Sequence, residues 1–119
     1  MKVEDAIIIY NYCEKIKSEL IILSSLIEEA SNVKAENVEG ARKIVLAFFN
    51  ALIGEIRTAK AITKVEDFSK VEFNLMECLG SFNLRKIKDA QENVGKTLTA
   101  TTTICHQAVE TLKDRNLIR

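Results

Sequence analysis

The stretch from residue 6 to residue 30, AIIIYNYCEKIKSELIILSSLIEEA, decides the fold class of this chain. Apolar and small residues recur in it at alternating steps of three and four, the spacing of one face of a long amphipathic helix. This series consists of Ala6, Ile9, Cys13, Ile16, Leu20, Leu23, Ile27 and Ala30. A second apolar line contains Ile8, Tyr12, Ile22 and Leu26. It widens the stripe beyond a two-stranded coiled-coil seam, toward the face that a bundle helix buries, so we expect a helix over about residues 3–30.

A second helix is expected over about residues 38–62. Asn37 is a candidate N-cap, and Glu39 in the first turn suits the positive end of the helix dipole. Its predicted core face contains Ala41, Val45, Phe48, Leu52, Ile56 and Ala59, and further apolar residues, Ile44, Leu46, Phe49 and Ile53, surround the helix. A helix that is apolar on several sides is either central in its fold or pressed against another subunit.

Two more helices follow, over about residues 64–79 and 84–116. The sequence Thr63-Lys64-Val65-Glu66 has the form of a capping box, and Gly80 suits a left-handed helix end. The weakest helical signal is the run from Thr97 to Thr103, where β-branched residues lower helix propensity. A single strand there is the alternative, although no second strand is visible to pair with it.

Length and composition favour one globular domain over residues 1–119. The chain has 47% hydrophobic and 29% charged residues, which are globular proportions, and it contains four glycines and no proline. No repeat, linker or shift in composition divides it. We therefore predict an all-α fold, a single-domain bundle of about four helices with antiparallel up-down topology.

Charge and hydropathy indicate a cytoplasmic protein. Seventeen basic residues balance seventeen acidic ones, so no overall field attracts the chain to nucleic acid or to an anionic membrane. The apolar run from Ala6 to Tyr10 is too short for a membrane span and follows two acidic residues, which is unlike a signal peptide.

The leading functional hypothesis is a non-enzymatic bundle that acts through protein association, with a homodimer favoured. It follows from an apparent excess of apolar surface on the second and third helices. The candidate interface residues are Phe48, Phe49, Ile53, Phe73 and Met76. An unknown protein partner is the other form of this hypothesis, and we expect no membrane partner.

A DNA-binding regulator is the first alternative. The third predicted helix, the Gly80 turn and the following basic residues resemble a helix-turn-helix, whose second helix would present Arg85, Lys86 and Lys88. The balanced net charge and the acidic residues Asp89 and Glu92 argue against nucleic-acid binding.

A bundle that binds a metal or a small ligand is the second alternative. Cys13, Cys78 and Cys105 fall at core spacing, where they are either plain core residues or a thiolate cluster. A ligand pocket would lie near Thr97, Thr101 and Cys105, and His106 is the only histidine.

No motif in the sequence carries a reaction. The segment AQENVGKT at residues 90–97 resembles a loose phosphate-binding loop, but a helical pattern precedes it where such a loop needs a buried strand. We therefore assign no catalytic residue, no metal ligand and no cofactor, and expect the protein not to be an enzyme.

Overall fold

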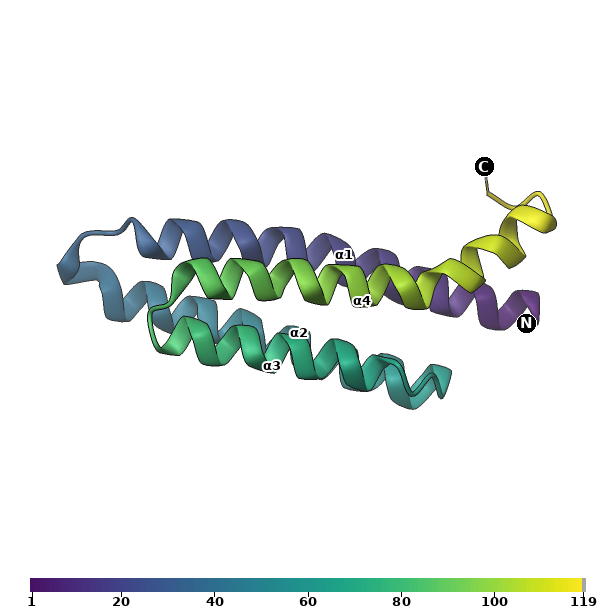
Figure 1. Ribbon diagram of the computed structural model, residues 1–119, viewed down its shortest axis with the longest axis horizontal. Coiled ribbons are helices and arrows are strands. Elements are labelled where there is room, and N and C mark those ends of the chain that lie inside the picture. The colour runs from purple at the N-terminus through teal and green to yellow at the C-terminus, as the bar shows by residue number, and fades with distance from the viewer. Residues whose placement is uncertain (119) are drawn as a thin grey trace.

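Four long helices form an antiparallel up-down bundle in the computed structural model, which describes residues 1–118 (Figure 1). They are α1 (Val3–Ser31), α2 (Val38–Thr63), α3 (Phe68–Asn83) and α4 (Ile87–Asp114), and a 3-10 turn, η1 (Ala35–Asn37), precedes α2. Each helix packs on its neighbours in chain order, and α4 closes the ring against α1. The predicted all-α bundle is confirmed, and the strand alternative is excluded because the threonine run lies inside α4.

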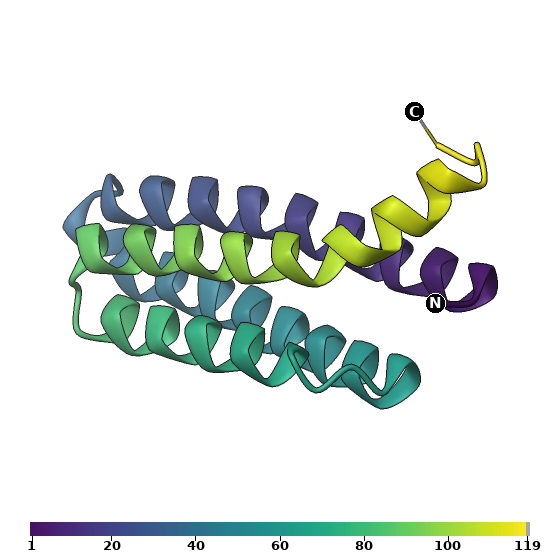
Figure 2. The same ribbon diagram turned by 45° about the vertical axis from the view of Figure 1, so that its right-hand side comes forward.

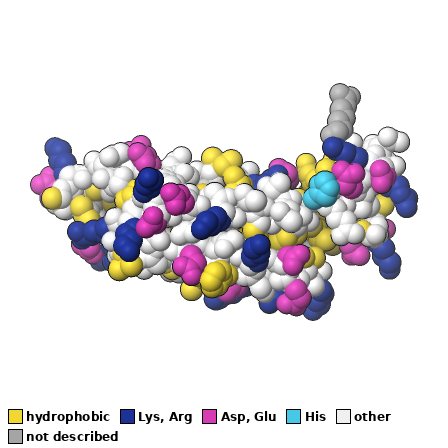
Figure 3. Space-filling model, viewed as in Figure 1, with side chains coloured by type: hydrophobic (Ala, Val, Ile, Leu, Met, Phe, Trp, Pro, Cys, Tyr) yellow, Lys and Arg dark blue, Asp and Glu magenta, His cyan; other side chains and the backbone are white. Residues whose placement is uncertain are grey.

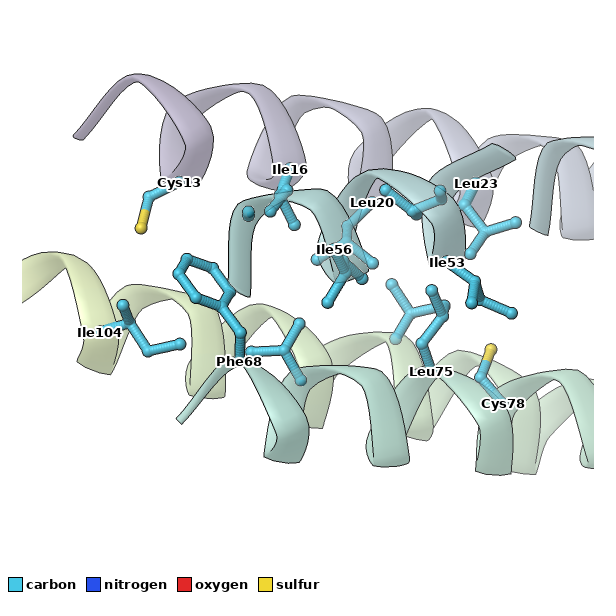
Figure 4. Packing of buried hydrophobic residues seen from close by; sticks show 14 of the residues in the cluster. Cys13, Ile16, Leu20, Leu23, Ile53, Ile56, Phe68, Leu75, Cys78 and Ile104 are labelled. Carbon is cyan, nitrogen blue, oxygen red and sulfur yellow. The ribbon is translucent and has the colours of Figure 1, made fainter. Parts of the chain in front are cut away.

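The core runs along the axis of this ring, and Figure 4 shows how its side chains meet. The α1 series from Ala6 to Ile27 is buried as its spacing predicts. On α2 the buried series is Val45, Phe49, Leu52, Ile53, Ile56 and Ala59. Phe49 is therefore the core phenylalanine of α2, whereas Phe48 is only partly buried.

The connection between α2 and α3 differs from the predicted capping box. Lys64 has a left-handed backbone with φ of 61° and ends α2, its N–H donating to the Lys60 carbonyl at 2.9 Å. The Thr63 hydroxyl accepts from the N–H of Val65 at 3.3 Å, not from Glu66. The prediction that a helix starts at residue 64 is wrong: α3 begins four residues later, at Phe68.

The turn between α3 and α4 also lies further along the chain than predicted. Gly80 is inside α3, and Arg85 takes the left-handed conformation, with φ of 60°. The Lys86 N–H donates to the Ser81 carbonyl at 2.9 Å, the long hydrogen bond that closes this kind of helix end. The short loop moves the start of α4 from the expected residue 84 to Ile87, and α4 ends at Asp114 where residue 116 was expected.

The last turns of α4 bend away from the bundle axis (Figure 2). Just before the bend, the hydroxyls of Thr97, Thr101, Thr102 and Thr103 donate to carbonyls one turn back, at 2.7 to 3.0 Å. Such bonds compete with the helix's own hydrogen bonds and bend it. The start of α1 and the end of α4 extend beyond the shorter α2–α3 hairpin (Figure 1).

Candidate interaction surface

The side of the bundle formed by α1 and α2 presents a regular double row of side chains. Lys15 Nζ lies 2.8 Å from Glu55 Oε1. Two helical turns away, Ile8 of α1 and Ile62 of α2 line the same small hollow. Both pairs have the same register, so continuing it from Lys15 by two turns places Ile22 opposite Phe48, and by three turns places Leu26 opposite Ile44. We call this surface the α1–α2 face. It consists of Ile8, Tyr12, Lys15, Glu19, Ile22 and Leu26 from α1, and Ile44, Phe48, Ala51, Glu55, Thr58 and Ile62 from α2.

Both ends of the α1–α2 face are apolar and exposed. Ile8 and Ile62 at one end are 40% and 54% exposed, and Ile22 and Ile44 at the other end are 48% and 66% exposed. Phe48 and Leu26 are partly buried beneath the second pair, against the core. Isolated exposed isoleucines are ordinary, but clusters at matching positions on two adjacent helices form a continuous patch.

The centre of the face is polar and shallow. Tyr12, Lys15 and Glu19 of α1 and Ala51, Glu55 and Thr58 of α2 line an open depression. Lys15 is exposed, and its hydrogen bond to Glu55 raises the pKa of its ammonium group. The Lys15–Glu55 ion pair joins the two helices across this depression.

Glu19 and Glu55 share this centre as a carboxyl pair. Partial burial, together with a hydrogen bond and charge repulsion from Glu55, raises the pKa of Glu19 to about 7. Lys15 acts in the opposite direction, because a nearby cation favours the ionised carboxylate. The α1–α2 face therefore changes its charge near neutral pH.

The residues predicted for an interface are divided between core and surface. Phe49 and Ile53 are 0% and 6% exposed, so these two assignments are corrected: they belong to the core of the bundle itself. Phe73 and Met76 of α3 are 61% and 44% exposed. Phe48 was predicted on the core face, and Ile8 and Ile22 were predicted on a second apolar line that widens the buried face of their helix; that prediction is wrong for both isoleucines, which are exposed. Ile44 was predicted only as one of the apolar residues around α2, and no role was predicted for Ile62.

The crossed arrangement of a helix-turn-helix is absent from α3 and α4. These helices run side by side and antiparallel in both ribbon views, whereas a helix-turn-helix joins its helices at roughly 90–120° (Figures 1 and 2). The exposed basic side chains at the turn between α3 and α4 and at the start of α4 are Arg85, Lys86 and Lys88. The rest of α4 packs along α1 and α3. The structure thus corrects the predicted resemblance to this motif.

The three cysteines do not form one cluster. All are free and buried, but Cys78 lies far along the core from Cys13 (Figure 4), where its thiol donates to the Ala90 carbonyl at 3.2 Å. Burial raises the pKa of Cys78 to about 12. Within residues 1–118 no group of three or more His, Cys, Asp or Glu side chains is placed to hold a metal ion.

The two buried threonines of α4 bond to its own backbone, and its histidine faces solvent. Thr97 and Thr101 are completely buried, and their hydroxyls donate to the carbonyls of Asn93 and Thr97. His106 is exposed, on the outer side of α4 (Figure 3). The segment that resembles a phosphate-binding loop lies within continuous helix, so its backbone N–H groups are not arranged around a ligand.

A search for similar protein families, characterised relatives and solved structures found no match to this chain. Within the described residues 1–118, no helix is both long and apolar enough to cross a membrane.

Proposed function

We propose that this protein acts without catalysis, through association of two copies by the α1–α2 face. The observation that carries the proposal is the arrangement of four exposed isoleucines, Ile8 and Ile62 at one end and Ile22 and Ile44 at the other, around a polar centre. Because both ends carry the same kind of side chain, the face is complementary to a copy of itself turned end over end.

A two-fold axis that lies in the plane of the face, perpendicular to α1 and α2, brings the two copies together in this way. It places α1 against α1 and α2 against α2, each pair antiparallel. With the axis midway between Lys15 and Glu19, Lys15 of one protomer faces Glu19 of the partner subunit. The same operation places Ile8 opposite Leu26 of the partner subunit, and Ile44 opposite Ile62 of the partner subunit. Apolar groups thus coincide across the contact, and above the pKa of Glu19 opposite charges coincide as well, which favours a second copy over an unrelated occupant.

The dimensions of the face predict a weak dimer. From residue 8 to residue 26 a helix rises roughly 27 Å, and two adjacent helices are about 20 Å wide. Such a patch buries on the order of 1,000 Å² in total, the lower limit for a specific interface. We therefore expect association in the micromolar range.

A cytoplasmic location belongs to the same proposal. Three free, buried cysteines suit a reducing compartment better than an oxidising one.

Sedimentation velocity over a concentration series tests the dimer and its surface. The wild-type chain should shift from monomer to dimer as its concentration rises, and Ile22→Asp and Ile44→Asp should each weaken association by about tenfold or more. Phe73→Asp is the matched control, because Phe73 is equally apolar and exposed but lies on α3. A wild-type chain that stays monomeric, or a dimer lost only in Phe73→Asp, would contradict the proposal.

A further inference from the structure

A hollow of about 270 Å³ lies at one end of the bundle, where the chain turns from α1 into α2 and from α3 into α4. Both connections are at the same end in the two ribbon views (Figures 1 and 2). The end of α1, the start of α2, the end of α3 with its following turn, and the start of α4 all line the hollow. It shares no residue with the α1–α2 face and is therefore separate from the proposed dimer contact.

The inner wall of the hollow is apolar. Phe82 is only 7% exposed and packs on Phe49 of the core, with 5.8 Å between the ring centroids. Ala30, Val38 and Ile87, one from each of the other three helices, are half-buried and line the same hollow. Pockets for drug-sized ligands have volumes of roughly 300–1,000 Å³, so this hollow suits a smaller molecule.

The charged side chains that line the hollow are two arginines, Arg42 and Arg85. Arg42 is held in place, because its Nη2 donates to Asn83 Oδ1 at 3.1 Å and its Nη1 lies 3.9 Å from Glu39 Oε2. Arg85 is exposed and has no ion-pair partner among residues 1–118. A guanidinium group has several N–H donors in a planar fork that matches a carboxylate, so both arginines have donors left for an anion.

Two helices also begin at the hollow, α2 at Val38 and α4 at Ile87. In the part of the chain that the structure describes, neither start has a side-chain capping hydrogen bond, and the first N–H groups of a helix carry partial positive charge. The ends of α1 and α3 lie here too, but carbonyl groups of both accept hydrogen bonds within their own turns, at 2.7 to 3.1 Å. The backbone thus adds to the preference of the two arginines for an anion.

We propose that this hollow binds a small carboxylate with a short apolar tail, of the kind found in medium-chain fatty acids. The tail lies against Phe82 and Ile87, and the carboxylate accepts hydrogen bonds from Arg42 and Arg85. A single negative charge fits better than a polyanion, because Glu39 already offsets part of the charge of Arg42. An inorganic anion would leave the apolar wall uncovered, and a neutral alcohol would leave the arginines without an anionic partner.

Titration of the full-length chain with octanoate, followed by calorimetry and by proton–nitrogen correlation NMR, tests the site. Octanoate should give saturable shifts centred on the α3–α4 turn and the start of α2, and acetate and octanol should bind at least about tenfold more weakly. Arg85→Gln should weaken octanoate binding by about tenfold or more, because it removes charged hydrogen bonds. Lys86→Gln is the matched control and should bind like the wild type, since Lys86 is also basic and exposed but does not line the hollow.

Ala30→Leu tests the apolar wall without changing any charge. The larger side chain occupies part of the hollow, so the affinity for octanoate should fall about as much as in Arg85→Gln although both arginines remain. The melting temperature of each variant without octanoate shows that the chain is still folded.

Four results would overturn the inference. Octanol that binds as tightly as octanoate would show that the arginines do not recognise the ligand. Equal losses in Arg85→Gln and Lys86→Gln would show that general positive charge attracts it. Shifts centred on the exposed isoleucines of the α1–α2 face would show that the tail binds any apolar patch, and the absence of saturable binding in the millimolar range would show that the hollow is not a site for this ligand.

Discussion

Ser24 and Gln91 join α1 to α4 through two opposed hydrogen bonds. The Ser24 hydroxyl donates to Gln91 Oε1 at 2.7 Å, and the Gln91 side-chain nitrogen donates to the Ser24 carbonyl at 2.9 Å. Gln91 occupies a position that helical spacing assigns to the inner side of α4, so its polar groups need these partners. The pair fixes the register between the first and last helices.

A double-mutant cycle measures this coupling. Ser24→Ala should cost about 1 kcal/mol, because it leaves a partly buried amide oxygen without a donor. In the Gln91→Leu background the same change should cost almost nothing. Urea unfolding of the four chains gives the coupling free energy, and equal costs in both backgrounds would show that the bonds do not act as a pair.

Lys64 holds a backbone conformation that suits glycine better. Its φ is 61°, in the left-handed region at the end of α2. Lys64→Gly should therefore raise the free energy of unfolding, by about 0.5–1 kcal/mol. Lys60→Gly, one turn earlier and inside α2, is the control and should lower it by a similar amount. Thermal or urea unfolding checks both signs, and a loss of stability in Lys64→Gly would contradict the expectation.

Exposure separates two substitutions on α2 that the sequence does not distinguish. Ile53 is 6% exposed and Ile44 is 66% exposed. Ile53→Glu places a charge in the core and should lower the free energy of unfolding by more than about 3 kcal/mol. Ile44→Asp should change the stability of the monomer by less than about 1 kcal/mol and act on association instead. Unfolding measured at low protein concentration, below the range of association, makes the comparison.

How much of the fold could be predicted from the sequence depends on the kind of sequence signal. The α1 series gave the correct core face because its period extends over several turns and packing only reinforces it. The ends of α3 were misplaced because Lys64 and Arg85 adopt left-handed conformations that glycine favours, while Gly80 remains helical. Turn geometry overrode the usual residue preferences there.

The candidate surface was only partly predictable for a different reason. Phe48 and Phe49 are adjacent and equally apolar, so their burial is decided by the angle at which α2 faces the ring. That angle is a property of the assembled bundle.

The carboxyl pair on the α1–α2 face predicts that stability depends on pH. The folded-state pKa of Glu19, about 7, lies above its ordinary value of 4.5. Between these values the folded chain binds more protons than the unfolded chain, so the free energy of unfolding must fall as the pH rises from about 5 to about 8. Because Glu19 is partly exposed, we expect a loss of about 1 kcal/mol, less than full burial would give.

Glu19→Gln isolates this contribution, because the amide keeps the shape of the side chain and cannot ionise. The variant should match the wild type near pH 5 and be the more stable chain near pH 8. Melting curves at several pH values, recorded at concentrations where the chain is monomeric, provide the comparison. Parallel pH profiles for the two chains would mean that Glu19 titrates normally. The α1–α2 face would then carry its full negative charge at neutral pH. Two copies could associate through it only if Lys15 offset the charges of both Glu19 and Glu55.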